Sequence, residues 1–194
     1  MRNRRNRIIM AGVTFIVALS SLFAQGGKEI SADNGSEGIL LMREEEKLAR
    51  DVYLTLYDLY SVPVFLNIAQ SEQRHTDSVK WLIEQKGLTD PVISDEIGEF
   101  SDDELQQLYQ VLIEQGSQSL SQAFIVGALV EELDIYDIER LLEDEDDIQI
   151  IRVYDNLLEG SMNHLRSFYS KIVKSGEDYL PSYITEDRFQ QIVQ

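Results

Sequence analysis

The chain has 194 residues, of which 43% are hydrophobic and 27% charged, a mixture that suits one globular domain with small extensions. Its formal charge of −18 excludes nucleic acid and anionic membrane surfaces as partners of that domain, because both would repel it. Cysteine is absent, which excludes disulfides, thiolate metal sites and cysteine nucleophiles.

The amino terminus, residues 1–24, has the pattern of a secretory signal peptide. Four arginines are followed by an uncharged apolar run over residues 8–24. An uncleaved membrane anchor is the alternative, because about 17 apolar residues is the lower limit for spanning a bilayer. We therefore expect an exported protein, periplasmic or secreted, with membrane contact only through residues 8–24 if they are retained. The glycine-rich residues 25–36 are predicted to form a linker.

Two long helices are predicted first. Apolar residues repeat at spacings of three, four and seven over residues 37–60 and again to about residue 86. The break between them is short, and Pro63 suits the first turn of the second helix, which Gly87 ends. So short a turn makes the two helices antiparallel neighbours.

A long connection follows, over residues 88–117. It contains a short helix that Ser101 is expected to open, with Glu104 at the capping-box spacing. Two more long helices are predicted at 120–142 and 148–174, separated by an acidic turn, and a short terminal helix lies in the tail. Short connections on both sides of a long crossover between helices 2 and 3 predict an all-α, ferritin-like four-helix bundle over residues 37–194.

The chain has only two histidines, His75 and His164, and both lie inside predicted helices. Glu72 precedes His75 by three residues, so both side chains leave one face of the helix. Glu-x-x-His is the inward-facing pair of di-iron bundles. Because the chain has 35 acidic residues, such a pair also arises by chance, and the other helices must be considered.

Each of the other long helices offers a candidate ligand. Glu46 shares a helical face with Tyr53, and Glu131 lies within an apolar stripe, where a carboxylate costs several kcal/mol unless its charge is compensated. Asp134 follows one turn later, and His164 lies on the apolar stripe of the last long helix. Carboxylates with imidazole suit iron or manganese, whereas a zinc site would use fewer acids.

A bundle without metal explains the same residues in another way. The run Glu44–Glu46 would be a solvated face, and a buried histidine would be a hydrogen-bonded core residue. Glu131 and Glu132 are adjacent, so one of them is expected to be outside the core.

Four segments resemble known ferritin-like proteins. FLNIAQSEQRH (65–75) resembles the second bundle helix of rubrerythrins, and REEEKLARDVY (43–53) resembles their first, with a Glu, Ala and Tyr spacing that bacterioferritins share. With VGALVEELDI (126–135) and GSMNHLRSF (160–168), nearly the whole mature chain is similar to a prokaryotic ferritin-like family, domain of unknown function 2202.

The resemblance implies a di-iron site with Glu46, rather than Glu44 or Glu45, as its first ligand. The other implied ligands are Glu72, His75, Glu131 and His164. One position departs from the di-iron pattern, because Ser161 stands where relatives carry a glutamate before His164. Asp134 could supply the missing carboxylate; otherwise the second metal is weakly held or the site holds one metal. The pair Gly160–Ser161 would leave a vacant coordination position or merely permit close helix packing.

Three functions remain open from the sequence. The first is a redox metalloprotein, in which two ferrous ions reduce peroxide or dioxygen, or in which iron itself is oxidised, with electrons from a separate donor. Glu72 and Glu131 would bridge, Glu46 and Asp134 would be terminal, each histidine would cap one iron, and Tyr53 would hydrogen-bond a ligand carboxylate. The second is metal binding or storage without turnover, with manganese or a single metal as variants. The third is a helical protein-interaction module with a vestigial site. The oligomeric state is open, a homodimer being one option.

Overall fold

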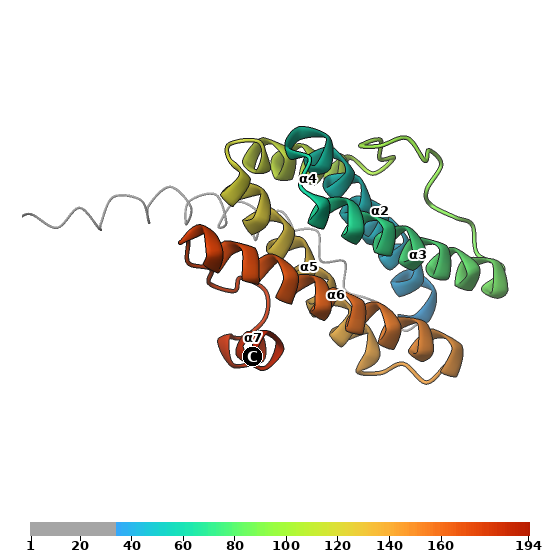
Figure 1. Cartoon of the computed structure of the whole chain (residues 1–194). Helices are drawn as coiled ribbons and strands as arrows, with labels where there is room; N and C mark the ends of the chain where they lie inside the picture. The colour runs from blue at the N-terminus through green and yellow to red at the C-terminus, as the bar shows by residue number, and fades with distance from the viewer. Residues whose placement is uncertain (1–33) are drawn as a thin grey trace, which may run out of the picture. The chain divides into compact units, whose positions relative to one another are not determined.

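The computed structural model describes residues 34–194, and the regular secondary structure of this part of the chain is entirely α-helical (Figure 1). Its six helices are α2 (Asn34–Tyr60), α3 (Pro63–Lys86), α4 (Asp103–Gly116), α5 (Leu120–Leu142), α6 (Ile148–Ser175) and α7 (Glu186–Val193). The predicted all-α class is confirmed. The predicted signal peptide lies outside the described residues, and α2 begins at Asn34 rather than Glu37, so the end of the predicted linker is helical. Within 34–194, no helix is long and apolar enough to cross a membrane.

Local chemistry sets most helix ends. Gly87 ends α3 in the left-handed region at φ 65°, where glycine carries no steric penalty. The Ser119 hydroxyl accepts a hydrogen bond from the first turn of α5, and Asp147 caps α6 in the same way. The cap of α4 is Asp102 rather than the predicted Ser101. The Asp102 carboxylate accepts from two backbone N–H groups and carries the negative charge that a helix start favours.

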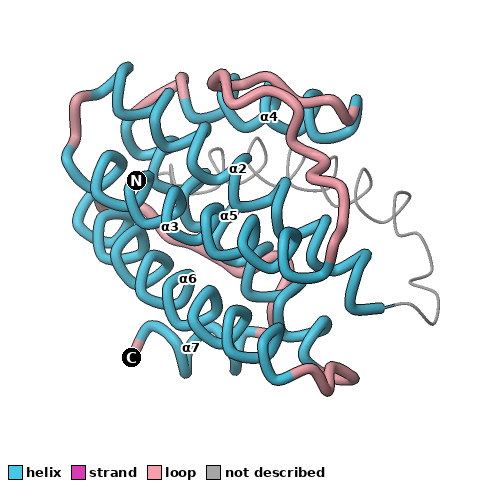
Figure 2. The backbone as a smooth tube through the Cα atoms, turned by 90° about the vertical axis from the view of Figure 1, so that its right-hand side faces the viewer, coloured by secondary structure: helices cyan, strands magenta, loops and turns pink. Residues whose placement is uncertain are grey.

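The long helices pack in pairs. Helix α2 lies against α3 and α5, and α6 lies against α5 and α3, so the four enclose a common interior (Figures 1 and 2). Helix α4, within the crossover from α3 to α5, packs on α5 and α2, while α7 packs on α6. The interior they enclose is where inward side chains of four different helices can meet.

Apolar side chains close this interior on both sides of its centre. Toward one end, the Phe65 ring lies 5.6 Å from that of Phe124 and 5.7 Å from that of Phe168. Toward the other end, a buried cluster includes Val79 and Ile138. Along α3 and α5 the candidate ligands lie between these apolar residues in sequence, so the structure places polar groups in a largely dry setting.

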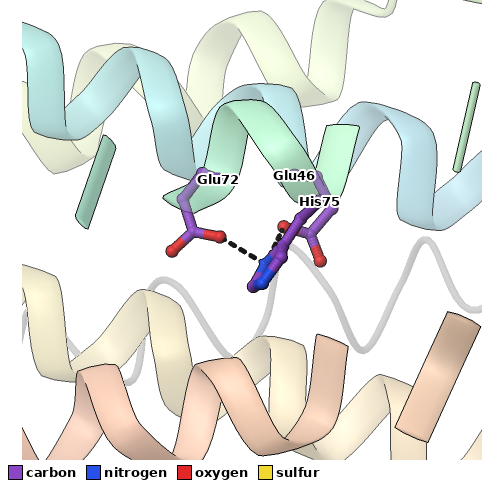
Figure 3. A group of neighbouring side chains, drawn as sticks. All are labelled: Glu46, Glu72 and His75. Atoms are coloured by element: carbon purple, nitrogen blue, oxygen red, sulfur yellow. Dashed lines mark hydrogen bonds and ion pairs between the residues drawn. The ribbon is translucent and has the colours of Figure 1, made fainter. Parts of the chain in front are cut away.

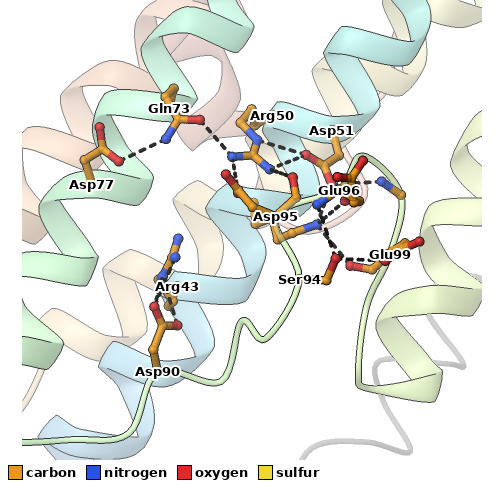
Figure 4. A network of polar contacts seen from close by, with 12 residues as sticks. Arg43, Arg50, Asp51, Gln73, Asp77, Asp90, Ser94, Asp95, Glu96 and Glu99 are labelled. Atoms are coloured by element: carbon orange, nitrogen blue, oxygen red, sulfur yellow. Dashed lines mark hydrogen bonds and ion pairs between the residues drawn. The ribbon is translucent and has the colours of Figure 1, made fainter.

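The outward face of α2 is covered by the crossover (Figure 4). The Lys47 ammonium lies 2.6 Å from Asp51 Oδ2, donates to two crossover carbonyls and sits 4.3 Å from the centre of the Phe100 ring. Arg43 pairs with Asp90 in the same loop. These contacts direct the basic face of α2 toward the crossover and so turn Glu46 toward the interior.

The alternative interpretation, in which Glu44–Glu46 form a solvated face, is wrong for two of the three. Glu45 is 2% exposed and Glu46 is fully buried. The reason is tertiary, because the crossover covers one side of α2 while α3 and α5 cover the others.

Candidate metal centre

Three carboxylates and two imidazoles from four helices converge in the interior. We call Glu46, Glu72, His75, Glu131 and His164 the carboxylate–histidine cluster. It divides into two groups, Glu46–Glu72–His75 and Glu72–Glu131–His164, and within each group one ligand atom per residue lies within 4.8 Å of the others. Figure 3 shows the first group, with Glu72 and His75 on α3 facing Glu46 from α2. Only Glu72 belongs to both groups, so Glu131, expected as a second bridge, lies in one.

Glu72 stands between the two histidines. Its Oε2 atom lies 2.7 Å from Nδ1 of His75, and its Oε1 atom lies 2.7 Å from Nδ1 of His164. Among residues 34–194, neither oxygen has a partner in hydrogen-bond geometry. Each oxygen therefore lies close to a histidine nitrogen without the alignment that a hydrogen bond requires. The two imidazole rings stack with centres 5.7 Å apart.

The other carboxylates complete the two groups. Oε2 of Glu46 lies 3.2 Å from Nδ1 of His75, and Oε2 of Glu131 lies 3.4 Å from Nδ1 of His164. The three glutamates are fully buried, whereas the two histidine side chains are 12% and 11% exposed. Access from solvent is therefore on the histidine side of the cluster.

Tyr53 holds one of the carboxylates in place. Its hydroxyl donates to Oε1 of Glu131 at 2.6 Å and lies 3.2 Å from the carbonyl oxygen of Gly127. The hydrogen bond expected from Tyr53 to a candidate ligand is thus present. It occupies one oxygen of Glu131 and leaves Oε2 facing His164 without a hydrogen bond.

Asp134 lies beside the two groups and in neither of them. It is 1% exposed, and its Oδ2 has no hydrogen-bond partner in the described part of the chain. Burial and then the nearby negative charges of Glu46 and Glu131 raise its pKa well above the usual value. Asp134 is therefore a further buried carboxylate that interacts electrostatically with both groups but belongs to neither.

The space beside Gly160 is filled. A Cβ atom on Gly160 would lie 2.5 Å from Cε1 and 2.6 Å from Nε2 of His75, so the imidazole occupies the volume of a missing side chain. Ser161 is fully buried, and its hydroxyl donates to the Leu157 carbonyl in its own helix. Gly160 therefore permits close packing between α6 and the His75 ring of α3, which is one of the two alternatives that the sequence left open.

Glu132 overturns another expectation. Both Glu131 and Glu132 are fully buried, although one was expected outside. Glu132 does point away from the cluster, but the segment before α7 covers it and donates several hydrogen bonds to its carboxylate. Glu45 was also missed; burial and the charge of Asp137 raise its pKa well above normal. Residue type alone gave no signal for either position.

The electrostatics differ sharply within the cluster. Burial disfavours the charged form of Glu72, but the close contacts and positive charges of His164 and His75 outweigh it and lower its pKa to about 2. Burial raises the pKa of Glu46 to about 8 and that of Glu131 to about 7. Burial also works against charging the histidines, but the neighbouring carboxylates raise the pKa of His75 to about 10 and of His164 to about 11. Without a cation, protons bound to Glu46, Glu131 and the two histidines offset the negative charge of the cluster.

These shifts predict how the stability of the metal-free protein depends on pH. The stabilisation from Glu46 and Glu131 is complete below about pH 4.5 and is lost as the pH rises to about 8. That from the histidines is complete below about pH 6.5 and is lost toward pH 10–11. Glu72 acts in the opposite direction, and its stabilisation is lost as the pH falls from about 4.5 to 2. We expect the urea midpoint of metal-free protein to be higher at pH 5 than at pH 9.

The control is Glu46→Gln, because a glutamine amide has no carboxyl proton to lose as the pH rises. Its midpoint should fall less steeply between pH 5 and pH 8 than that of the wild type. Parallel slopes would show that general repulsion from the charge of −18, rather than the cluster, sets the pH dependence.

The fold and this site define an all-helical protein with a buried carboxylate–histidine cluster. Residues 35–194 match the model of a family described as an uncharacterized protein domain (DUF2202), and the chain belongs to that family. It is 45% identical over 166 residues to the uncharacterized protein MJ0754 of Methanocaldococcus jannaschii, covering 86% of this chain and 90% of the relative. The crystal structure of hypothetical protein MJ0754 from Methanococcus jannaschii DSM 2661 matches with a TM-score of 0.81, over 86% of this chain and 94% of that one.

Proposed function

We propose that the protein is a ferritin-like four-helix bundle that binds two metal ions, with iron as the metal, and uses them to reduce peroxide or dioxygen. The paired packing of α2 with α3 and of α5 with α6, joined by a long crossover, supports the bundle. The observation that carries the proposal is Glu72, whose two oxygens each approach one histidine nitrogen while neither makes a hydrogen bond.

The donor set fits such a pair of ions. Several buried atoms of metal-binding type have no hydrogen-bond partner within residues 34–194. They are Glu46 Oε1, Glu72 Oε1 and Oε2, Glu131 Oε2, His164 Nδ1 and Asp134 Oδ2. Orphaned acceptors of this number are costly in a dry interior and are satisfied by cations. Carboxylate oxygen with imidazole nitrogen suits iron or manganese. Glu46 and His75 would hold one ion, Glu131 and His164 the other, and Glu72 both.

The chain's own residues prepare this chemistry. When bound, two ferrous ions would supply the two electrons that reduce peroxide to water or dioxygen to peroxide. Glu72 lies between the two histidines and contacts both of them. Tyr53 donates to the other oxygen of Glu131 and so keeps Oε2 directed at His164. The aromatic and aliphatic residues on either side exclude water from the carboxylates. Asp134 lies outside both groups, but its buried Oδ2 would supply a further carboxylate ligand where Ser161 offers none.

The test is a metal count followed by oxidation. Protein loaded anaerobically with ferrous iron is expected to hold two ions per chain and to be oxidised by hydrogen peroxide much faster than free ferrous iron at the same concentration. Repeated cycles with an added reductant would show turnover. Two ions without accelerated oxidation would restrict the function to metal binding, and no bound metal would overturn the proposal.

We also propose that the protein is exported, on the sequence pattern of residues 1–24. Export places the cluster in the cell envelope or outside the cell, where the electron donor would be a separate protein. Amino-terminal sequencing of the protein from cell fractions tests this, since a first residue near position 25 is expected.

A further inference from the structure

The C-terminal segment, defined as residues 179–194, wraps around one buried carboxylate. Oε1 of Glu132 accepts hydrogen bonds from the backbone N–H groups of Ser182 and Ile184, at 2.5 and 2.9 Å, and from that of Tyr183. Oε2 accepts from the Tyr179 hydroxyl at 2.5 Å. Both oxygens of Glu132 are therefore committed to this one segment.

The rest of the C-terminal segment is anchored beside α5 and α6. Arg188 donates to Glu139 on α5 at 2.8 Å, and Arg166 on α6 donates to the Ile192 carbonyl at 2.5 Å. The buried ring of Phe189 lies edge-on to Tyr169 of α6, with centres 5.1 Å apart. The segment thus joins the two helices that carry Glu131 and His164.

The rotational position of helix α5 about its own axis depends on contacts with other segments. Residues 126–135 are all buried, so no polar face opposite an apolar one defines how this helix is turned. Glu131 and Glu132 are identical in chemistry and lie ~100° apart around the helix. A rotation by that angle would exchange them; within α5 itself it is opposed at Gly127, where a side chain would meet the Phe168 ring at 2.6 Å.

We propose that the C-terminal segment sets the rotational position of α5, with Glu132 as the positioning residue that keeps Glu131 directed at His164. This inference rests on the proposed metal site for its functional meaning. Rotation of α5 would withdraw the acceptor from four donors, three of which are backbone N–H groups of the C-terminal segment. Glu132 therefore stabilises one setting of α5 in which Oε2 of Glu131 meets Nδ1 of His164.

Two substitutions at Glu132 and one control test this by metal titration. Glu132→Ala removes every acceptor and should weaken the ion held by Glu131 and His164 at least tenfold, while the ion at Glu46 and His75 changes less than threefold. Glu132→Gln retains one oxygen for the three N–H groups and should recover most of the binding. Glu139→Gln disturbs the same segment farther along and should leave both ions within twofold of wild type. Equal affinities in Glu132→Ala and wild type would overturn the inference.

A second readout does not depend on metal. The chain has no cysteine, and Ile138 on α5 is fully buried between two partly exposed neighbours, so Ile138→Cys introduces a single thiol that a rotation of α5 would expose. The thiol should be protected in this background and at least tenfold more reactive when Glu132→Ala is added, but not with Glu139→Gln. If the wild type bound no metal, the proposed function would fail while this measurement still decided the inference. A thiol equally protected in both backgrounds would show that the segment does not position α5.

Discussion

Substitution of Glu72 by glutamine is expected to weaken both metal ions together, each by at least about a hundredfold, since loss of a shared ligand should exceed the 10–100-fold cost of losing a supporting hydrogen bond. Glutamine keeps the shape of the side chain but lacks the negative charge and one of the two oxygens that face His75 and His164. Metal titration measured by calorimetry gives both affinities. The variants Glu46→Gln and Glu131→Gln should each weaken mainly one ion, because each belongs to a single group.

The matched control is Glu159→Gln, an exposed glutamate on α6 that should bind two ions as the wild type does. In the metal-free protein, Glu72→Gln should also lower the pKa of both histidines, which NMR can follow because the chain contains only two. If Glu72→Gln retained one ion at full affinity, Glu72 would not be shared, and the two groups would act independently.

Substitution of Gly160 by alanine is expected to remove the ion held by Glu46 and His75 while the other ion remains. The added methyl group would lie 2.5 Å from the His75 ring, so the ring must leave the position from which Nδ1 faces Glu46 and Glu72. Overpacking of this kind also destabilises a fold by about 1–3 kcal/mol. Metal stoichiometry should fall from two to one, and the urea midpoint should fall as well.

Gly38→Ala separates the two effects. Its added methyl group would lie 2.7 Å from a Leu141 methyl carbon and 3.1 Å from the Tyr154 hydroxyl, so it overpacks a part of the fold that holds no cluster residue. Gly38→Ala should lower the urea midpoint while leaving two ions bound. Loss of one ion in both variants would mean that stability, and not the place of His75, controls the stoichiometry.

The candidate site was partly predictable because some of its geometry is local. Glu72 and His75 are three residues apart in a helix, so they share a face whatever surrounds that helix. Glu131 was identifiable as a carboxylate within an apolar stripe. The sequence also showed Ser161 where relatives carry a glutamate, and the structure adds that its hydroxyl donates to the Leu157 carbonyl of the same helix.

The errors arose where a side chain depends on a distant segment. Nothing around Glu132 indicates that residues 179–184 will cover it, because hydrogen bonds from about fifty residues away leave no periodic signal. The same holds for Glu45, which the helix pattern of α2 does not distinguish from Glu44. The His75 ring contacts Gly160 across α3 and α6, and the residue spacing within either helix does not predict a contact between helices.

The sequence by itself determined the helices, most of their ends and the pairing of Glu72 with His75, because hydrophobic spacing, capping groups and the helical repeat act over a few residues. Only the tertiary structure decided that Glu72 approaches both histidines, that the C-terminal segment covers Glu132, and that Asp134 stands apart from both groups. These outcomes depend on how four helices are turned against one another. Long-range packing and the pairing of buried charges determine these rotational positions. A local sequence pattern carries no information on either.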